Sequence, residues 1–202
     1  MVTKPLHFCI HGAGGLGSLI GGYLATAGFD TTLIARPEHT DRILAHGLQI
    51  SGVRGDLTIR DHLHTVTHPD RINRDIDFYI LLTKVKDGAV ALDDAAVIAD
   101  RVACALSLQN GIDKEAALID CFGADKVIGG SIIEGATLAG PGRIHHHVTV
   151  PTTAYFGEFD GGISARAESI ADAFNQAGLG SRAVDDIQHV LWEKVVQVGG
   201  AS

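Results

Sequence analysis

Short hydrophobic runs and amphipathic stretches alternate along most of the chain. The first run, at 6–10, is followed by glycines and then by apolar residues at i, i+3, i+4, i+7 and i+8, the spacing of one helix face. That face consists of Leu16, Leu19, Ile20, Tyr23 and Leu24. Gly28 stands where a helix-ending glycine is expected, and a second hydrophobic run follows at 31–35. The chain therefore opens with a predicted strand–helix–strand unit.

The same alternation continues to residue 133. Further strands are expected at 78–83, 102–108 and 127–133, and further helices at 39–46, 89–99 and 113–121. The run at 78–83 is almost continuously hydrophobic, which is typical of a central strand covered on both faces. Two shorter segments, at 48–52 and 56–59, predict a hairpin or a pair of extended arms. Repeated units of this kind predict the α/β class with a doubly wound Rossmann-type sheet, in which the carboxyl ends of the strands share one ligand-binding edge.

The pattern changes after residue 133. A turn is expected at Pro141-Gly142, with antiparallel extended segments at 143–149 and 153–156. A helix is expected at 164–177. Near the end of the sequence, an apolar stripe predicts one more helix, with a face made of Ile187, Val190, Leu191, Val195 and Val198.

A glycine-rich segment lies between the first predicted strand and the first helix. It consists of Gly12, Ala13, Gly14, Gly15, Leu16 and Gly17. The pattern G-x-G-x-x-G is weak by itself in a chain with 25 glycines, but in this context it is the dinucleotide-binding fingerprint. We expect Gly12 to form the tight turn, Gly14 to admit the pyrophosphate and Gly17 to allow close helix–strand packing. The alternative is a glycine-rich turn without a ligand.

The end of the second predicted strand bears on the choice of cofactor. An NAD site usually carries Asp or Glu there, on the ribose 2′-hydroxyl. This chain has Arg36, which can grip a 2′-phosphate through two hydrogen bonds. The sequence therefore favours NADP(H). A solvated surface arginine is the alternative, and the nearby Glu38 leaves some ambiguity.

Two further loops follow hydrophobic strands, at the edge where this architecture binds ligands. In the first, Lys86 is placed to reach the cofactor or a substrate carboxylate, with Lys84 as a competing candidate and solvated lysines as the alternative. In the second, Asn110 offers an amide and Gly111 lets the backbone turn, whereas the alternative is a simple Asn-Gly turn.

Lys194 occupies the i+7 position of the last apolar stripe and therefore faces the same way as its hydrophobic residues. A lysine in that place either extends its ammonium group from the edge of the core to water, or stays desolvated. A desolvated lysine at a cofactor crevice can act as a general acid, because burial lowers its pKa toward the working pH.

Composition narrows the classes of function. A net charge of −8 without a basic stripe argues against a nucleic-acid partner, and no apolar run approaches the roughly 18 residues of a membrane span. The N-terminal residues run directly into the first strand, without the cleavage site of a signal peptide. Cys9, Cys104 and Cys121 are odd in number and set among apolar residues, which is typical of thiols in a reducing compartment. We therefore expect a cytoplasmic protein.

The run His145-His146-His147 invites interpretation as a metal site. On a strand, His145 and His147 face one side and His146 the other, and no carboxylate or cysteine stands at ligand spacing. We expect no metal site.

In their order along the chain, these motifs resemble the ketopantoate reductases (2-dehydropantoate 2-reductases). The resemblance rests on the glycine segment, Arg36, the Lys86 loop, Gln109-Asn110-Gly111, the segment from Pro141 to the phenylalanine at 156, and Trp192-Glu193-Lys194. Many families share the glycine motif, whereas the Gln-Asn-Gly loop combined with a Trp-x-Lys helix at this separation is much more specific. The resemblance spans essentially the whole chain.

The resemblance implies NADPH-dependent reduction of a small branched 2-keto acid to a 2-hydroxy acid, on the route to pantothenate. It implies that Lys194 donates the proton to the carbonyl oxygen as hydride arrives from the nicotinamide. The cofactor-binding residues that it implies are 12–17 for the pyrophosphate, Arg36 for the 2′-phosphate, and Lys86, Asn110 and Ala136 for the rest of the site.

The chain also departs from the family pattern. Family members usually carry asparagines one and two turns beyond the lysine, where this chain has Val198 and Ser202. The family also continues into a helical C-terminal domain, which is largely absent from this sequence. We therefore expect residues 1–185 to form an NADP-binding Rossmann-like domain and 186–202 to begin the helix that leads into that domain.

Two other interpretations stay open. The first is a truncated NADP(H)-binding module without activity of its own, and the second is a related reductase with a different keto substrate. The sequence does not decide the oligomeric state, although an exposed apolar stripe at 187–198 would favour a homodimer.

Overall fold

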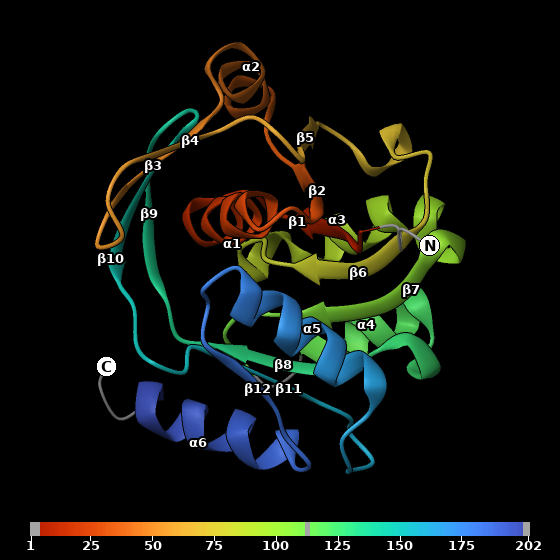
Figure 1. The fold of residues 1–202 in the computed structure, drawn as a ribbon. Helices are drawn as coiled ribbons and strands as arrows, with labels where there is room; N and C mark the ends of the chain where they lie inside the picture. The colour runs from red at the N-terminus through yellow and green to blue at the C-terminus, as the bar shows by residue number, and fades with distance from the viewer. Residues whose placement is uncertain (1–4, 112–113, 200–202) are drawn as a thin grey trace.

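The computed structural model describes residues 5–111 and 114–199. Its centre is a parallel five-stranded sheet of order β5-β2-β1-β6-β7 (Figure 1). The strands are β1 (His7–His11), β2 (Asp30–Ile34), β5 (Leu63–Val66), β6 (Ile76–Leu81) and β7 (Val102–Ser107). The α/β class and the Rossmann-type sheet predicted from the sequence are confirmed.

The helices follow from local sequence signals. Helix α1 (Gly15–Thr26) ends before Gly28, whose φ of +92° is a conformation that glycine adopts readily. Helix α2 (Pro37–His46) has its proline at the first position, where a missing N–H costs nothing. The Ser164 hydroxyl caps α5 (Ala165–Gln176). The other helices are α3 (Gly88–Ala95), α4 (Lys114–Phe122) and α6 (Ile187–Gly199).

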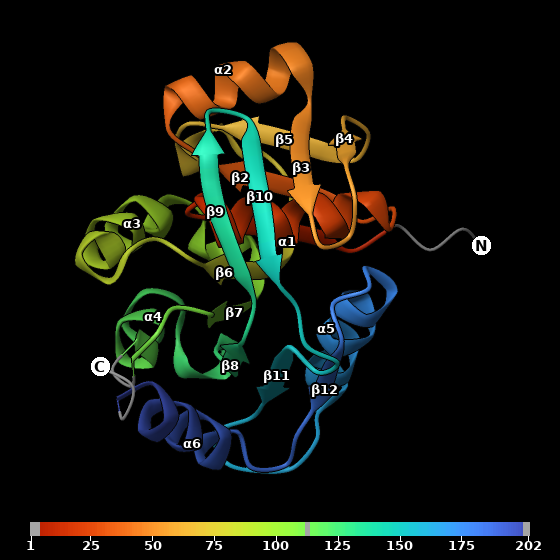
Figure 2. The same cartoon turned by 90° about the vertical axis from the view of Figure 1, so that its left-hand side faces the viewer.

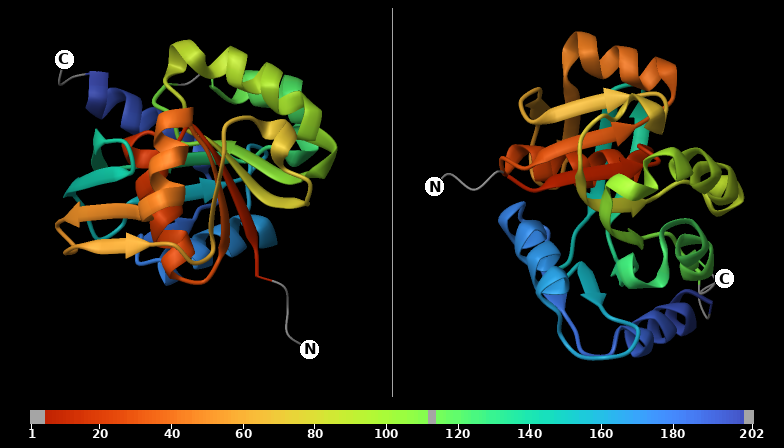
Figure 3. Two further views of the ribbon diagram at one scale, coloured as in Figure 1. Left: turned by 90° about the horizontal axis from the view of Figure 1, so that it is seen from above. Right: turned by 90° about the vertical axis from the view of Figure 1, so that its right-hand side faces the viewer.

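Alternate residues of the central strands face two separate cores. On β1, Phe8 and Ile10 belong to the core on the α1 side, whereas Cys9 belongs to the core beneath α3 and α4. Figure 3 shows these helices on opposite sides of the sheet. Because both faces are covered, the strands are nearly continuously hydrophobic.

A second sheet, of order β4-β3-β10-β9, covers the side of α1 that faces away from the central sheet (Figure 2). Its strands are β3 (Leu48–Gly52), β4 (Leu57–Ile59), β9 (Gly135–Gly140) and β10 (Arg143–Val148). The hairpin predicted at 48–59 is confirmed by the antiparallel pairing of β3 with β4. The turn predicted at Pro141-Gly142 joins β9 to β10.

A third sheet, of order β12-β11-β8, lies beyond β7 and packs against α5 and α6. It consists of β8 (Gly129–Ile132), β11 (Ala154–Gly157) and β12 (Ser181–Ala183). The sequence led us to expect that 143–149 pairs with 153–156, and this is wrong. Instead, β10 pairs with β3 and β9, and β11 pairs with β8 and β12. The strands were found, but their partners lie elsewhere in the sequence.

The three consecutive histidines lie on β10, where one is buried and two are exposed. His146 is buried, with Nδ1 2.8 Å from the Tyr23 hydroxyl and Nε2 2.8 Å from a Glu134 carboxylate oxygen. His145 and His147 are exposed on the other face of β10, with ring centroids 4.6 Å apart. Among residues 5–111 and 114–199, no group of three or more His, Cys, Asp or Glu is placed to hold a metal ion.

None of the helices within residues 5–111 and 114–199 combines the length and apolar character needed to cross a bilayer.

Candidate functional site

The glycine segment forms a tight turn from β1 into α1. Gly12 has a φ of +107°, and a Cβ built on it would lie 2.3 Å from the Thr83 amide nitrogen. A Cβ on Gly17 would lie 2.3 Å from the Gly12 carbonyl oxygen. A larger residue at Gly12 would therefore push the turn away from the loop that follows β6, and one at Gly17 would push α1 away from the turn. Gly14 differs, because a Cβ there meets nothing within 4 Å.

The open side of Gly14 adjoins the N-terminus of α1. The first helical bond is donated by the Ser18 amide to the Gly14 carbonyl at 3.0 Å, so the amides of residues 15–17 precede the helical hydrogen-bond series. The first turn contains no acidic residue. Unpaired amides and the positive end of the helix dipole together suit a phosphate group. Ala136 of β9 borders this turn, since its carbonyl oxygen would lie 2.7 Å from a Cβ on Gly15.

Arg36 lies at the same edge of the sheet. It follows β2 and precedes the first residue of α2, and the Ala13 amide of the glycine turn donates to the Ile34 carbonyl at 3.1 Å. Its side chain is exposed and makes no ion pair with another described residue. Glu38, in the first turn of α2, is exposed as well.

A buried glutamine joins the two loops that follow β6 and β7. Gln109 Nε2 donates to the Thr83 carbonyl at 2.7 Å, and the Ser107 hydroxyl donates to Gln109 Oε1 at 3.1 Å. Lys86 is exposed in a 3-10 turn at Val85–Asp87 and does not line the cavity described below. The sequence analysis quoted the Gln109-Asn110-Gly111 motif but gave a role to Asn110 and none to the glutamine that links the two loops.

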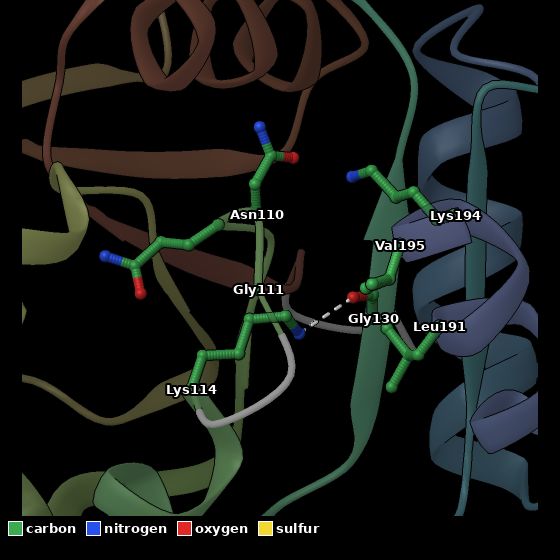
Figure 4. Close-up of a pocket in the computed structure, with 8 residues that line it drawn as sticks. Asn110, Gly111, Lys114, Gly130, Leu191, Lys194 and Val195 are labelled. Atoms are coloured by element: carbon green, nitrogen blue, oxygen red, sulfur yellow. Dashed lines mark hydrogen bonds between the residues drawn. The ribbon is translucent and has the colours of Figure 1, made fainter. Parts of the chain in front are cut away.

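A cavity of about 230 Å³ opens between the loop after β7 and helix α6 (Figure 4). It is lined by Gln109, Asn110, Gly111, Lys114, Gly130, Leu191, Lys194 and Val195. Figure 4 shows Asn110 and Lys194 on opposite sides of it. The structure thus brings the predicted amide and the predicted lysine to one cavity, although 84 positions separate them in the sequence.

Lys194 is held at the wall of this cavity. Its Nζ donates to the Ile132 carbonyl of β8 at 2.8 Å. Burial, and next the positive charge of Lys114, lower the pKa of Lys194 to about 8. A lysine with such a pKa is mostly protonated at neutral pH and gives up its proton more readily than an exposed lysine does. The acid role of Lys194 stays a prediction.

Lys114 was not found from the sequence. Only 5% of its side chain is exposed, and its Nζ donates to the Ser107 carbonyl at 3.0 Å, to the Gly130 carbonyl at 3.1 Å and to the Glu115 carboxylate. Burial lowers its pKa, and Glu115 opposes that effect. One signal was available in the sequence. A cation in the first turn of a helix is disfavoured by the helix dipole, so a lysine at that position indicates a specific interaction that holds it there.

The chain departs from the ketopantoate reductase pattern at positions 198 and 202, and neither side chain can be placed in the site. The side chain of Val198 and the whole of Ser202 lie outside the described residues.

The chain is similar to named proteins over almost its full length. It is 33% identical over 188 residues to a 2-dehydropantoate 2-reductase of Archaeoglobus fulgidus, covering 93% of this chain and 59% of the relative. The crystal structure of 2-dehydropantoate 2-reductase from Methylococcus capsulatus has 30% sequence identity and a TM-score of 0.80, covering 95% of this chain and 61% of that one. The chain therefore spans about three fifths of the length of these relatives.

A third comparison broadens the range of substrates and cofactors among the similar proteins. The ternary structure of D-mandelate dehydrogenase with NADH and anilino(oxo)acetate has 26% identity and a TM-score of 0.80, covering 94% of this chain and 60% of that chain.

A family model settles the assignment. The model of ketopantoate reductase PanE/ApbA matches residues 8–161, a range that runs from β1 through the glycine turn and the Gln-Asn-Gly loop to just beyond β11. With this match and the similarity to the archaeal enzyme, the family suggested by the motifs is confirmed, and the chain belongs to the ketopantoate reductase family.

Proposed function

We propose that this chain forms the nucleotide-binding part of an NADPH-dependent reductase that converts a 2-keto acid of the 2-dehydropantoate type into a 2-hydroxy acid. The observation that carries the proposal is the desolvated ammonium group of Lys194, which shares a cavity with Asn110 at the edge where the parallel strands end. Bound NADPH supplies the hydride for the keto carbon. The chain's own residues bind the two molecules and provide the proton.

The glycine turn is the proposed pyrophosphate site. The open side of Gly14 leaves room for the phosphates, and the amides at the start of α1 are free to bind them. Arg36 is proposed to bind the 2′-phosphate because it is exposed at the end of β2, beside that turn. The proposed positions of Lys86, Asn110 and Ala136 complete the cofactor site.

Lys194 is the proposed proton donor. As the keto carbon receives the hydride, negative charge grows on the carbonyl oxygen, and a nearby ammonium group can protonate it. The proton leaves Nζ, so Lys194 becomes a neutral amine while the oxygen becomes a hydroxyl. Since the acid must start protonated, turnover should fall as the pH rises above about 8, the pKa of Lys194.

The cofactor preference is tested by calorimetric titration with NADPH and NADH. We expect NADPH to bind at least roughly tenfold more tightly, and Arg36→Ala to remove this difference. Arg71→Ala is the matched control, because this exposed arginine precedes β6 and therefore lies toward the opposite edge of the sheet. Equal affinity of the unaltered chain for both cofactors would end the role given to Arg36.

The reaction is tested by following NADPH oxidation with ketopantoate and other 2-keto acids. We expect Lys194→Ala to remove most of kcat while leaving NADPH binding intact. The control is Lys126→Ala, since Lys126 also donates to a backbone carbonyl, at 2.9 Å, but does not line the cavity. An unchanged kcat in Lys194→Ala would exclude Lys194 as the acid.

Two alternatives remain, each with an observation in its favour. The likeness to D-mandelate dehydrogenase favours a reductase of another 2-keto acid, which a panel of aliphatic and aryl 2-keto acids would reveal. The glycine turn, whose open side at Gly14 is not part of the lysine cavity, favours a binding module, with 1–185 as the NADP-binding domain and 186–202 as the start of the connecting helix. Tight NADPH binding without turnover of any 2-keto acid would support the module.

We also propose a cytoplasmic location and a homodimer. Buried cysteine thiols suit a reducing compartment, and Trp192 and Val196 expose 56% and 71% of their surface on α6. Sedimentation equilibrium measures the second proposal directly, and a monomer at micromolar concentration would refute it.

A further inference from the structure

Lys114 and Lys194 bind neighbouring carbonyl groups of the same strand. The Lys114 Nζ donates to Gly130 O at 3.1 Å, and the Lys194 Nζ donates to Ile132 O at 2.8 Å. In an antiparallel pair, alternate residues bond to the partner strand. The amide of residue 133 donates to the carbonyl of Thr153, which directly precedes β11, so the carbonyls of Gly130 and Ile132 face the other edge of β8. Two ammonium groups, instead of a further strand, satisfy these carbonyls.

This arrangement fixes the two charges close together. Residues two apart on a strand are separated by roughly 6.6 Å, which is shorter than the roughly 8 Å over which physiological salt screens a charge. Both lysines also line one cavity, where the Lys114 side chain is buried and Lys194 is half-buried. Their repulsion is therefore poorly screened.

The Lys114 side chain is buried, and its ammonium group is fully hydrogen-bonded. Its three hydrogens are matched by three acceptors: the Ser107 carbonyl, the Gly130 carbonyl and the Glu115 carboxylate. It therefore has no hydrogen left for a substrate without breaking one of these bonds. Among the residues that the structure describes, the Ile132 carbonyl is the one acceptor of Lys194, so its ammonium group retains hydrogens for the carbonyl oxygen of a substrate.

The strands that pack against the helix of Lys194, β8 and β11, carry no charged side chain. The two strands contact α6, and their residues, Gly129–Ile132 and Ala154–Gly157, include no charged side chain, with Tyr155 as the one titratable group. On α6 itself, His189 and Glu193 pair with each other at the surface. Among the described residues of β8, β11 and the cavity lining, Lys114 is therefore the fixed charge that faces Lys194, with Glu115 behind it.

We propose that Lys114 of α4 is a positioning residue for the proton transfer: its positive charge, held against the Gly130 carbonyl of β8, repels the ammonium group of Lys194 and so favours transfer of the Lys194 proton to the keto oxygen. This rests on the proposed function. In the step, an N–H bond of Lys194 breaks and an O–H bond of the product forms, while NADPH is oxidised as its hydride reduces the keto carbon. Lys114 keeps its own protons throughout.

Titration of the lysine side chains by carbon-13 NMR tests the proposal on the unliganded protein. We expect Lys114→Gln to raise the pKa of Lys194 from about 8, by less than half of its lowering, because burial is the larger cause. Lys114→Arg retains the charge and should keep the pKa of Lys194 near 8. Lys126→Gln is the control, and it should change nothing at Lys194. An unchanged pKa of Lys194 in folded Lys114→Gln would overturn the proposal.

A second variant covers the case in which Lys114→Gln fails to fold. Lys114→Met keeps an unbranched side chain of similar length but removes its charge, so it too should raise the pKa of Lys194. An unchanged pKa of Lys194 in folded Lys114→Met would refute the interaction.

The pH profile of turnover separates this proposal from the proposed function. In an active reductase, the alkaline limb of kcat should move upward in pH with Lys114→Gln and return with Lys114→Arg. If no 2-keto acid is reduced, the proposed function fails, while the NMR titration still decides whether the two lysines interact. If the chain is active but the limb does not move, only the role of Lys114 falls.

Discussion

Gly17→Ala tests whether close packing of α1 on the glycine turn sets the geometry of the cofactor site. A Cβ at this position would lie 2.3 Å from the Gly12 carbonyl oxygen, whereas ordinary van der Waals contact begins at 3.4 Å. The obstacle is backbone and cannot rotate away. The start of α1 must therefore move by roughly 1 Å relative to β1.

The displacement has two costs of known size. Overpacking costs about 1–3 kcal/mol, and the better helix propensity of alanine offsets up to about 1 kcal/mol. We therefore expect the free energy of unfolding to fall by about 1–2 kcal/mol. A shift of 1 Å also stretches an amide–phosphate hydrogen bond from about 2.9 Å to about 3.9 Å, beyond bonding distance. Losing one such bond to a charged group costs about 1.5–3 kcal/mol, a roughly 10- to 150-fold rise in Kd for NADPH.

Calorimetry with NADPH and urea unfolding measure the two effects, and Gly14→Ala is the matched control. A Cβ at Gly14 meets nothing within 4 Å, so this variant should lose at most about 1 kcal/mol as a poorer helix cap. It should nevertheless bind NADPH more weakly, because its methyl group enters the space proposed for the pyrophosphate. Wild-type affinity for NADPH in folded Gly17→Ala would refute the reasoning. Wild-type affinity in Gly14→Ala would show that the pyrophosphate does not occupy the space beside Gly14.

Three further outcomes follow from buried groups. Arg166 binds both carboxylate oxygens of Glu158 at 2.7 Å and holds the pKa of Glu158 below its usual range, so the stability that this pair adds is present above pH about 4.3 and is lost as the pH falls through the lowered pKa. Arg166→Met should therefore flatten the fall in unfolding free energy at acid pH, and an unchanged fall in urea titrations would contradict this. Burial raises the pKa of the Cys104 thiol to about 12, so iodoacetamide at pH 8 should label it only after unfolding, and rapid labelling of the native protein would count against this. Phe156 is fully buried, with its ring 5.0 Å from that of Phe174, so Phe156→Ala should cost about 3–5 kcal/mol in urea unfolding, and a loss below about 1 kcal/mol would show that the third sheet repacks.

The first half of the fold could be predicted because its information is local. The strand β1, the helix α1 and the turn between them follow each other directly, and the periodicity of 16–24 marks the helix without knowledge of the rest. The pairing of β10 failed for the opposite reason. Its partner β3 precedes it by about 90 residues, and a hydrophobic pattern marks a strand without naming its partner.

Some elements carried too little signal to be found. Strand β9 reads Gly-Ala-Thr-Leu-Ala-Gly and is half-buried or exposed along its length, so it lacks the alternation that marks a strand with one buried face. Strand β12 has only three residues. The predicted helix at 89–99 ends as an α-helix at 95 and continues in the tighter 3-10 form to Arg101. Such short or weakly patterned segments take their structure from tertiary contacts.

The two parts of the candidate site differ in the same way. The glycine turn is a backbone site, encoded by consecutive residues, and its weak points are the positions where a side chain does not fit, such as Gly12 and Gly17. The lysine site joins side chains from α4 and α6 on the carbonyls of β8, so the sequence shows Lys194 through its apolar stripe but gives no hint that Lys114 faces it. Substitutions at the glycines should therefore weaken cofactor binding and folding together. Substitutions at the lysines should change proton transfer while NADPH still binds, and calorimetry combined with pH profiles can separate the two.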